Sequence, residues 1–157
     1  MTSVLAVDPG VHGAVAVLAE SGLPVFLEPF RPHMTAEEGV HLLERAHKMA
    51  GQNSIALIEK VGVMPGDGRQ GAFTFGRIAG GIEWALLALG ARICHVYPAV
   101  WQSSLGCLSG GNKNVTKRKA QELFSGMLPE GCSITHATAD ALLIAHYGLE
   151  KLGVLLP

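Results

Sequence analysis

The sequence predicts an α/β domain with a mixed sheet of about five strands flanked by helices. Three short apolar segments come first, and two more apolar segments then alternate with amphipathic stretches. This order is typical of a sheet with antiparallel strands at one side and crossover connections at the other. The 157 residues suffice for one compact core, so we expect residues 1–157 to form a single domain.

The first three strands are expected to form an antiparallel meander. Residues 3–8 are an apolar run that ends in Asp8 and is followed by a Pro-Gly turn. Residues 12–18 and 24–30 are the next strand candidates, and a Glu-Ser-Gly turn joins them.

Helices and strands then alternate. Thr35 and Glu38 have the spacing of a capping box and begin an amphipathic helix. Residues 55–59 are an apolar strand that ends in another carboxylate. A glycine-rich loop then leads into a helix over about 72–89.

The last third of the chain completes the sheet and adds three helical segments. Residues 91–96 read as a strand, and Pro98 begins a short helical turn that contains Trp101. Two longer helices are expected at about 115–127 and 137–152.

Three carboxylates lie in apolar surroundings. Asp8 and Glu59 each end a buried strand, and if both strands are central and parallel, the carboxylates emerge at one edge of the sheet. Ligands of α/β proteins usually bind at that edge. Asp140 lies in an apolar run whose neighbours should pack a helix on the sheet. Because a bare buried carboxylate is costly, we expect bound cations to compensate for the charge.

The residue types indicate the kind of cation. Hard oxygen ligands suit Mg²⁺ or Mn²⁺, and two such ions roughly 4 Å apart promote phosphodiester hydrolysis. His136 precedes Asp140 by four residues, so both can face one side of a helix, where a histidine can bind metal or carry a proton. We therefore predict a catalytic site for two Mg²⁺ ions, with Mn²⁺ as a substitute, made by Asp8, Glu59 and Asp140, with His136 as a fourth ligand or a proton carrier.

Each of these residues also has a plain structural interpretation. Asp8 could form a turn with the following Pro-Gly, and Glu59 could pair with a surface cation such as Lys60. Asp140 could lie on an exposed helix face, and His136 could be a capping or otherwise satisfied histidine. Their joint order and spacing favour function.

Three segments resemble a known family. The segments are Val-Asp-Pro-Gly-Val-His-Gly-Ala-Val-Ala-Val (7–17), Ile-Glu-Lys-Val-Gly-Val-Met-Pro-Gly-Asp-Gly-Arg-Gln-Gly (58–71) and His-Ala-Thr-Ala-Asp-Ala-Leu-Leu-Ile-Ala (136–145). Together they resemble RuvC-like Holliday junction resolvases of the RNase H-like superfamily. They correspond to the opening strand, the second acidic strand with its junction-contacting loop, and the closing acidic helix. The likeness covers about residues 3–150, and three motifs in order are specific where one alone is weak. The Gly-Arg-Gln-Gly loop and the His-x-x-Ala-acid pattern look most like the chloroplast resolvases of plants and algae, with phage enzymes second.

The resemblance implies an RNase H-like fold and a homodimer that cuts four-way (Holliday) junction DNA. Such an enzyme nicks two opposing strands symmetrically and leaves ligatable 5′-phosphates. The resemblance also assigns the metals to Asp8, Glu59 and Asp140, with His136 in the fourth position. It implies that the protein is located in the chloroplast nucleoid, with a transit peptide that is absent from this sequence, or else in the cytoplasm of a bacterial or phage-infected cell.

Two positions depart from the bacterial members of the family. An additional carboxylate is expected where Ala137 stands, and an aromatic residue that stacks on an unpaired base is expected where Gly62 stands. Phe73 or Phe75 could take over the stacking, although an aromatic residue on that helix is more often part of the core.

Candidate DNA contacts fall in the glycine-rich loop, on the helix after it, and in the basic segment 113–119, which has no acid. The basic segment could place Lys117 and Arg118 near a helix start, whose amides attract anions, or could be a solvated helix face. The predicted DNA-binding residues are Arg69, Gln70, Phe73, Lys113, Lys117, Arg118 and Lys119. A stripe on the helix over 72–89 either packs the core or forms the dimer face, and its residues are Ile82, Trp84, Leu86, Leu87 and Leu89.

Composition limits the other possibilities. The formal net charge of −1 counts mildly against nucleic-acid binding, although positive charge is concentrated in one segment. No apolar run reaches the ~18 residues of a membrane span, and we recognise no targeting segment ahead of the first strand. The three cysteines lack CxxC spacing, so they predict neither a disulfide framework nor a zinc site. We expect no membrane contact.

Three alternative functions compete with the nuclease. The glycines at 66, 68 and 71 match dinucleotide-binding spacing, but that fingerprint normally follows the first strand, so no nucleotide cofactor is expected. An actin-like ATPase begins with a similar strand-Asp-x-Gly segment but needs two such domains and a longer chain. A non-catalytic junction-binding module is the remaining alternative. The presence of Asp8, Glu59 and Asp140 argues against it, and the missing acid at Ala137 keeps it open.

Overall fold

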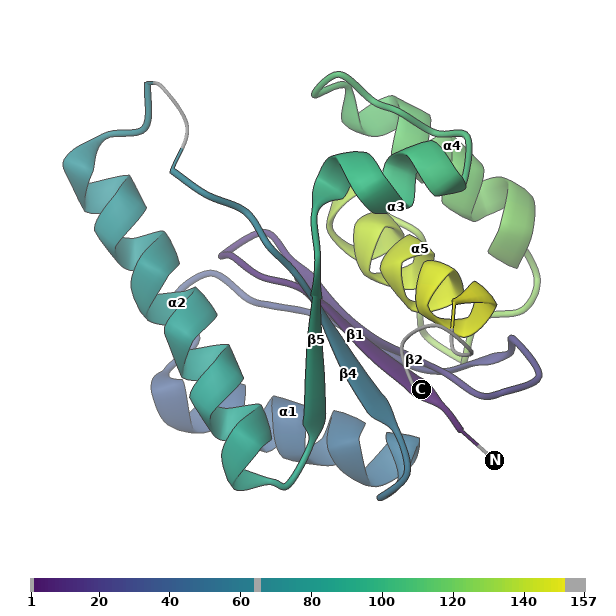
Figure 1. Ribbon diagram of the computed structural model, residues 1–157, viewed down its shortest axis with the longest axis horizontal. Coiled ribbons are helices and arrows are strands. Elements are labelled where there is room, and N and C mark those ends of the chain that lie inside the picture. Colours follow the sequence, from purple (N-terminus) through teal and green to yellow (C-terminus); the bar gives the residue numbers. More distant parts are fainter. Residues whose placement is uncertain (1, 64–65, 152–157) are drawn as a thin grey trace.

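Within residues 2–63 and 66–151, which the structure describes, five strands form one sheet with helices on both faces; Figure 1 shows this computed structural model. The strands are β1 (Val4–Asp8), β2 (Ala14–Leu18), β3 (Pro24–Pro29), β4 (Ile55–Glu59) and β5 (Arg92–Val96). The helices are α1 (Ala36–Ala50), α2 (Arg69–Ala88), α3 (Pro98–Ser104), α4 (Lys113–Phe124) and α5 (His136–Glu150).

The strand order is β3-β2-β1-β4-β5, which confirms the predicted mixed sheet. β1, β2 and β3 form the antiparallel meander, whereas β4 pairs in parallel with both β1 and β5. Val7 of β1 lies opposite Ile58 of β4. Because both strands run in the same direction in this register, the residues that follow, Asp8 and Glu59, reach the same edge of the sheet.

Side-chain alternation decides which face each carboxylate meets. Val4 and Ala6 of β1 pack with Leu57 of β4 in the apolar cluster beneath α5. The intervening residues of both strands pack in a second cluster beneath α1 and α2. Because successive side chains of a strand point to opposite faces, Asp8 points to the same face as Val4 and Ala6. Glu59 points to the same face as Leu57 for the same reason. Both carboxylates therefore point to the α5 side of the sheet.

Helix α5 packs closely on the centre of the sheet (Figure 1). Thr135 and Thr138 form a capping box that fixes where the helix begins. At Gly148 an added Cβ would lie 2.8 Å from a methyl group of Val4, so only glycine allows this approach. The helix was predicted to extend to Leu152, which lies outside the described residues.

Two helices begin two or three residues earlier than the sequence predicted. α2 begins at Arg69 rather than at 72, because Gly68 has an extended backbone and serves as the N-cap. α4 begins at Lys113 rather than at 115, because the Asn112 side chain accepts a hydrogen bond from the backbone N–H of Asn114. The first-turn capping box of α1 is present as predicted. No described helix has the length and apolar character needed to cross a membrane.

Candidate active site

Three acidic side chains meet at the carboxyl edge of β1 and β4. Asp8 is 7% exposed, Glu59 is 7% exposed, and Asp140, in the second turn of α5, is 9% exposed. Each of the two strand carboxylates interacts electrostatically with Asp140. The structure thus brings together the three acids that the sequence singled out, and the interpretation of Asp140 as an exposed helix residue is wrong.

The environment of Asp8 opposes ionisation. Burial raises the pKa of the Asp8 carboxyl well above its usual value, and the charges of Glu59 and Asp140 raise it further. The positive charge of Lys113 acts in the opposite direction. At neutral pH this group is therefore held in its charged form only at a cost to the fold.

Glu59 has a partner that the sequence did not predict. Nε1 of Trp101, a fully buried residue of α3, donates a hydrogen bond of 2.8 Å to Oε1 of Glu59. Burial raises the pKa of Glu59, and the bond from Trp101 is the largest influence that lowers it. The suggested surface pairing of Glu59 with Lys60 is wrong, because the Glu59 side chain is buried.

The donor set fits a divalent cation. Oδ1 of Asp140 is buried and lacks a hydrogen-bond partner among the described residues, and the three acids repel one another. A cation relieves both costs, and carboxylate oxygens are ligands that Mg²⁺ and Mn²⁺ prefer. The acids do not already enclose an ion: in the part of the chain that the structure describes, no three His, Cys, Asp or Glu side chains are grouped to hold one metal.

His136 stands beside this site as the first residue of α5, one helical turn before Asp140. Its side chain is exposed, and its Nε2 forms a 2.9 Å hydrogen bond with Oδ1 of Asn114 in α4. Asn114 follows Lys113, whose charge acts on Asp8 and Glu59. The first turns of α4 and α5 are therefore joined next to the carboxylates.

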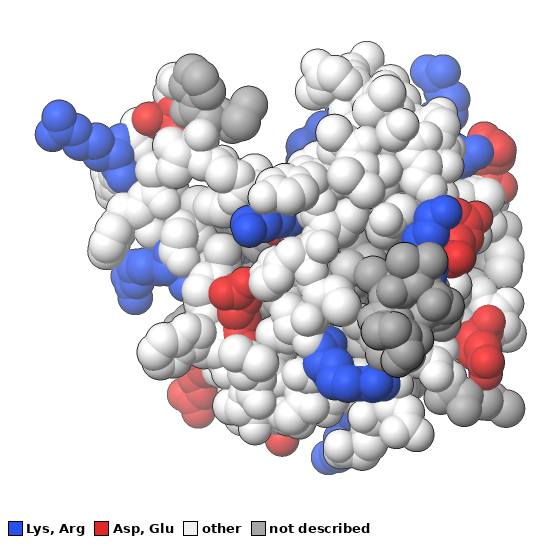
Figure 2. All heavy atoms as spheres, in the orientation of Figure 1, with Lys and Arg blue, Asp and Glu red and all other residues white. Residues whose placement is uncertain are grey.

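The predicted DNA-binding residues fall into two groups. Those of α2 and those of α4 lie on opposite sides of the edge where β4 and β5 end, and Figure 2 shows a notch between these two parts of the molecule. In that view Lys and Arg are scattered rather than gathered in one patch.

Within α4, the four cations differ. Lys113 and Arg118 are exposed, and Lys117 is half-buried. Lys119 pairs with Glu122 at 3.2 Å. Because α4 begins at Lys113, the expectation that Lys117 and Arg118 lie near its start is corrected: they lie in its second turn, and Lys113 is the cation at the start.

Within α2, Arg69 and Gln70 are exposed in the first turn. Phe73 is 68% exposed, and the guanidinium of Arg77 lies 6.0 Å from the centroid of its ring. Phe75 is half-buried, and the position of an added Cβ at Gly10 lies 3.8 Å from its ring. Of these two phenylalanines, Phe73 is therefore the exposed one.

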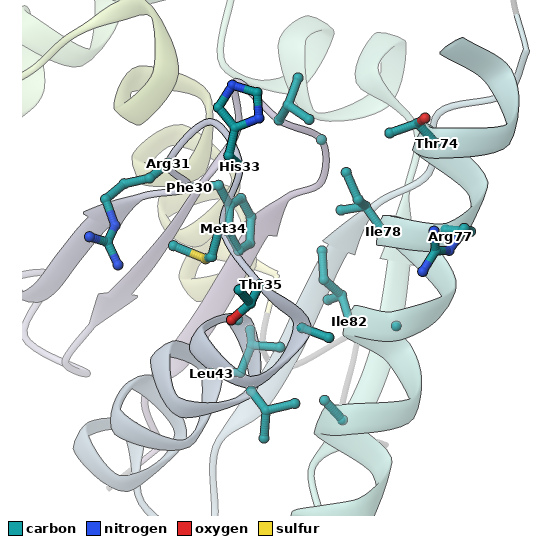
Figure 3. Close-up of a pocket in the computed structure, with 17 residues that line it drawn as sticks. Phe30, Arg31, His33, Met34, Thr35, Leu43, Thr74, Arg77, Ile78 and Ile82 are labelled. Carbon is teal, nitrogen blue, oxygen red and sulfur yellow. The ribbon is translucent and has the colours of Figure 1, made fainter. Parts of the chain in front are cut away.

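The larger of two hollows in the surface lies away from the acids. One of about 440 Å³ lies between α1 and α2 and is mainly apolar, with Phe30, Met34 and Ile78 in its wall (Figure 3). A smaller hollow of about 180 Å³ includes Glu59 and His95 in its wall. Asp8 and Asp140 line neither of these two hollows.

Trp101 and Asn114 are the two residues of the site that sequence reasoning missed. Trp101 was noticed only as part of a helical turn that begins at Pro98, and its partner Glu59 lies 42 positions earlier. Asn114 and His136 are 22 positions apart. Contacts over such separations depend on how α3, α4 and α5 pack, which local patterns do not report.

Comparison with solved structures supports the fold. No protein-family model matches the chain, and no curated protein matches it either. A structure of Thermus thermophilus RuvC in complex with a Holliday junction substrate matches with a TM-score of 0.70 and 19% identity, covering 98% of this chain and 96% of that one. A second Thermus thermophilus RuvC structure matches with a TM-score of 0.66 and 18% identity, covering 97% and 96%. The chain has the RNase H-like fold of these structures.

Proposed function

We propose that this chain is a structure-selective endonuclease that resolves four-way (Holliday) DNA junctions by symmetric paired nicking. The observation that carries the proposal is the buried set of Asp8, Glu59 and Asp140 at the carboxyl edge of the sheet. The same fold occurs in a RuvC structure that contains a Holliday junction substrate, which favours a junction over other nucleic acids.

The proposed reaction is hydrolysis of one phosphodiester in each of two opposing strands. A water oxygen adds to phosphorus and the bond to the 3′-oxygen breaks, which leaves a 3′-hydroxyl and a 5′-phosphate. Asp8, Glu59 and Asp140 would hold two Mg²⁺ ions, or Mn²⁺ in their place, with His136 as the fourth ligand beside the acid-free Ala137. When bound, the ions supply neutralisation of the charge that develops at the phosphate.

Two neighbours keep the acids ready to bind. The N–H of Trp101 and the charge of Lys113 both lower the pKa of Glu59, against the effect of burial. Lys113 also lowers the pKa of Asp8. Because ligands must be deprotonated to bind a cation, these two residues extend the working range toward lower pH.

DNA contacts are proposed on both sides of the carboxylate edge. The cations of α4 would bind phosphates, with Lys113 nearest the carboxylates and Lys119 a weaker contributor because it already pairs with Glu122. Arg69 and Gln70 would contact the junction from α2, and the exposed ring of Phe73 would stack on an unpaired base.

A homodimer is proposed to form through α2. Ile82 and Leu86 are buried in the core, whereas Trp84 is 79% exposed and Leu87 is 60% exposed. The stripe predicted from sequence therefore divides into a core face and an open apolar face. Exposed aromatic residues are enriched in protein interfaces, and a two-fold dimer suits a substrate with two equivalent cut sites. The proposed compartment, a chloroplast nucleoid, rests on the sequence resemblance.

The test separates binding from cutting. Asp8→Asn and Glu59→Gln are expected to abolish nicking of a four-way junction and to leave junction binding intact, as measured by gel shift and by strand cleavage in Mg²⁺. The second candidate, a non-catalytic junction-binding module, is favoured by the acid-free Ala137. Tight binding without nicking by the unmodified chain would establish that module instead.

A further inference from the structure

We propose that Asn114 is a positioning residue that fixes the tautomer of His136 and leaves Nδ1 as the ring nitrogen that binds a divalent cation. The inference rests on the proposed function, because it concerns the same metal site. It assigns one role to an amide that sequence patterns did not single out, and one atom to the histidine.

The contact joins two well-fixed backbones. His136 is the first residue of α5, and the preceding Thr135 caps that helix by accepting hydrogen bonds from two of its amides. Asn114 lies in the first turn of α4, where its own N–H donates a 3.1 Å bond to Oδ1 of Asn112. The 2.9 Å contact between His136 Nε2 and Asn114 Oδ1 therefore connects two helix starts rather than two mobile loops.

The chemistry of the pair selects one tautomer. A neutral imidazole has one N–H donor and one acceptor nitrogen, and an amide oxygen only accepts. The hydrogen bond to Oδ1 therefore places the proton on Nε2 and leaves the lone pair of Nδ1 free. Histidines that bind metals generally donate their other N–H to an acceptor, which fixes the ring and raises its basicity.

The position of His136 explains why this nitrogen would be used. Asp140 follows one turn later on α5, and its buried Oδ1 lacks a partner among the described residues. Ala137, between them, offers no ligand. A neutral nitrogen on the same helix adds a ligand without adding a fourth negative charge to a site whose acids already repel one another.

The same contact has a second consequence for the site. Asn114 is adjacent to Lys113, whose charge acts on Asp8 and Glu59. Removing the Asn114 side chain could therefore act through Lys113 as well as through the histidine. The experiment must separate these two routes, and the tautomer of His136 does so because a displaced lysine does not set it.

The experiment uses the full chain labelled with ¹⁵N-histidine, without DNA, and titrated with Mg²⁺. In the unmodified protein, the ring ¹⁵N shifts of His136 are expected to report the Nε2–H tautomer, and Mg²⁺ is expected to shift the Nδ1 resonance. Asn114→Leu is expected to give mixed tautomers and a 10–100-fold loss of Mg²⁺ affinity by calorimetry, the usual effect of losing such a partner. Asn114→Asp keeps an acceptor and should keep the tautomer.

Two controls complete the design. Gln121→Ala removes an exposed amide two turns further along α4 and is expected to change neither readout. In a His136→Ala background, Asn114→Leu is expected to cost no further Mg²⁺ affinity, because the two residues act as one unit.

Junction nicking is measured alongside. A chain that nicks junctions while Asn114→Leu retains the tautomer and full Mg²⁺ affinity would overturn the inference alone. A Mg²⁺-dependent shift at Nε2 would do the same. A chain that neither binds Mg²⁺ nor nicks junctions would overturn the proposed function and, with it, the inference.

Discussion

Replacing Asp8 by Asn is expected to stabilise the cation-free protein at neutral pH, although it abolishes cutting. Burial and the charges of Glu59 and Asp140 hold the pKa of Asp8 well above its usual value. A carboxyl whose pKa is higher in the folded state binds more protons when folded than when unfolded. Stability therefore falls as the pH rises from the unfolded pKa, about 4, through the raised folded pKa. Above that window the charged Asp8 is a net cost.

The size of the effect follows from that linkage. Each unit by which the folded pKa exceeds the unfolded one costs about 1.4 kcal/mol once the group is charged. Asparagine removes the charge and with it this cost. Its buried amide is incompletely hydrogen-bonded, which offsets about 1–3 kcal/mol of the stabilisation. We expect a net stabilisation because burial and two neighbouring charges all oppose the ionised form, and each kcal/mol of it raises Tm by about 2–4 °C in a chain of this size.

The assay is thermal unfolding between pH 5 and pH 8 in EDTA, then in Mg²⁺. In EDTA the advantage of Asp8→Asn is expected to grow with pH. In Mg²⁺ the unmodified protein should gain stability by mass action and the variant should gain little. Glu20→Gln, which neutralises an exposed carboxylate, serves as the control. A variant that is less stable than the unmodified protein at pH 8 in EDTA, or an advantage independent of pH, would refute the reasoning.

Three further changes test other parts of the site. Trp101→Phe removes the N–H that lowers the pKa of Glu59, so the acidic limb of the rate–pH profile should move to higher pH, with kcat reduced about tenfold or more; an unchanged limb would contradict that role. Lys113→Met should move the same acidic limb to higher pH, because the charge of Lys113 lowers the pKa of Asp8 and Glu59. Lys117→Met should leave that limb unchanged and should reduce the slope of log junction affinity against log salt concentration by about 1. Equal effects of the two lysines would erase the distinction between them. Trp84→Glu should convert a dimer to a monomer in sedimentation with unchanged helix content, and a persistent dimer would remove α2 as the interface.

Much of the fold could be predicted because its signals are local. The strands that end in Asp8 and Glu59 are short apolar runs, and the capping box at Thr35 marks a helix start without reference to the rest of the chain. The facing of the two carboxylates also follows from alternation along each strand once the strands are central and parallel. The core of the site was therefore readable from the sequence.

The surroundings of the acids were not readable in the same way. The hydrogen bond from Trp101 to Glu59 and the contact between Asn114 and His136 join segments that meet only after α3, α4 and α5 pack on the sheet. The start of α4 was missed because Asn112 provides the cap, and apolar periodicity in the helix begins only at Val115. Periodicity locates buried faces, but it does not report caps made by polar side chains.

The apolar stripe on α2 is another feature that local patterns could not assign. Apolar spacing predicted that Trp84 and Leu87 either pack the core or form an interface, and no local pattern could choose between them. The packing of α2 buries Ile82 and Leu86 and leaves the other two exposed. That choice depends on the rotation of the helix on the sheet.

The most direct test of the central proposal is strand cleavage of a labelled immobile four-way junction, with linear duplex as the control, in Mg²⁺ and in EDTA. We predict paired symmetric nicks in the junction alone, abolished by EDTA and by Asp8→Asn. Tight junction binding without cutting in Mg²⁺ or Mn²⁺ would contradict the nuclease and support the non-catalytic module. A chain that neither binds nor cuts junctions would contradict the proposed function entirely.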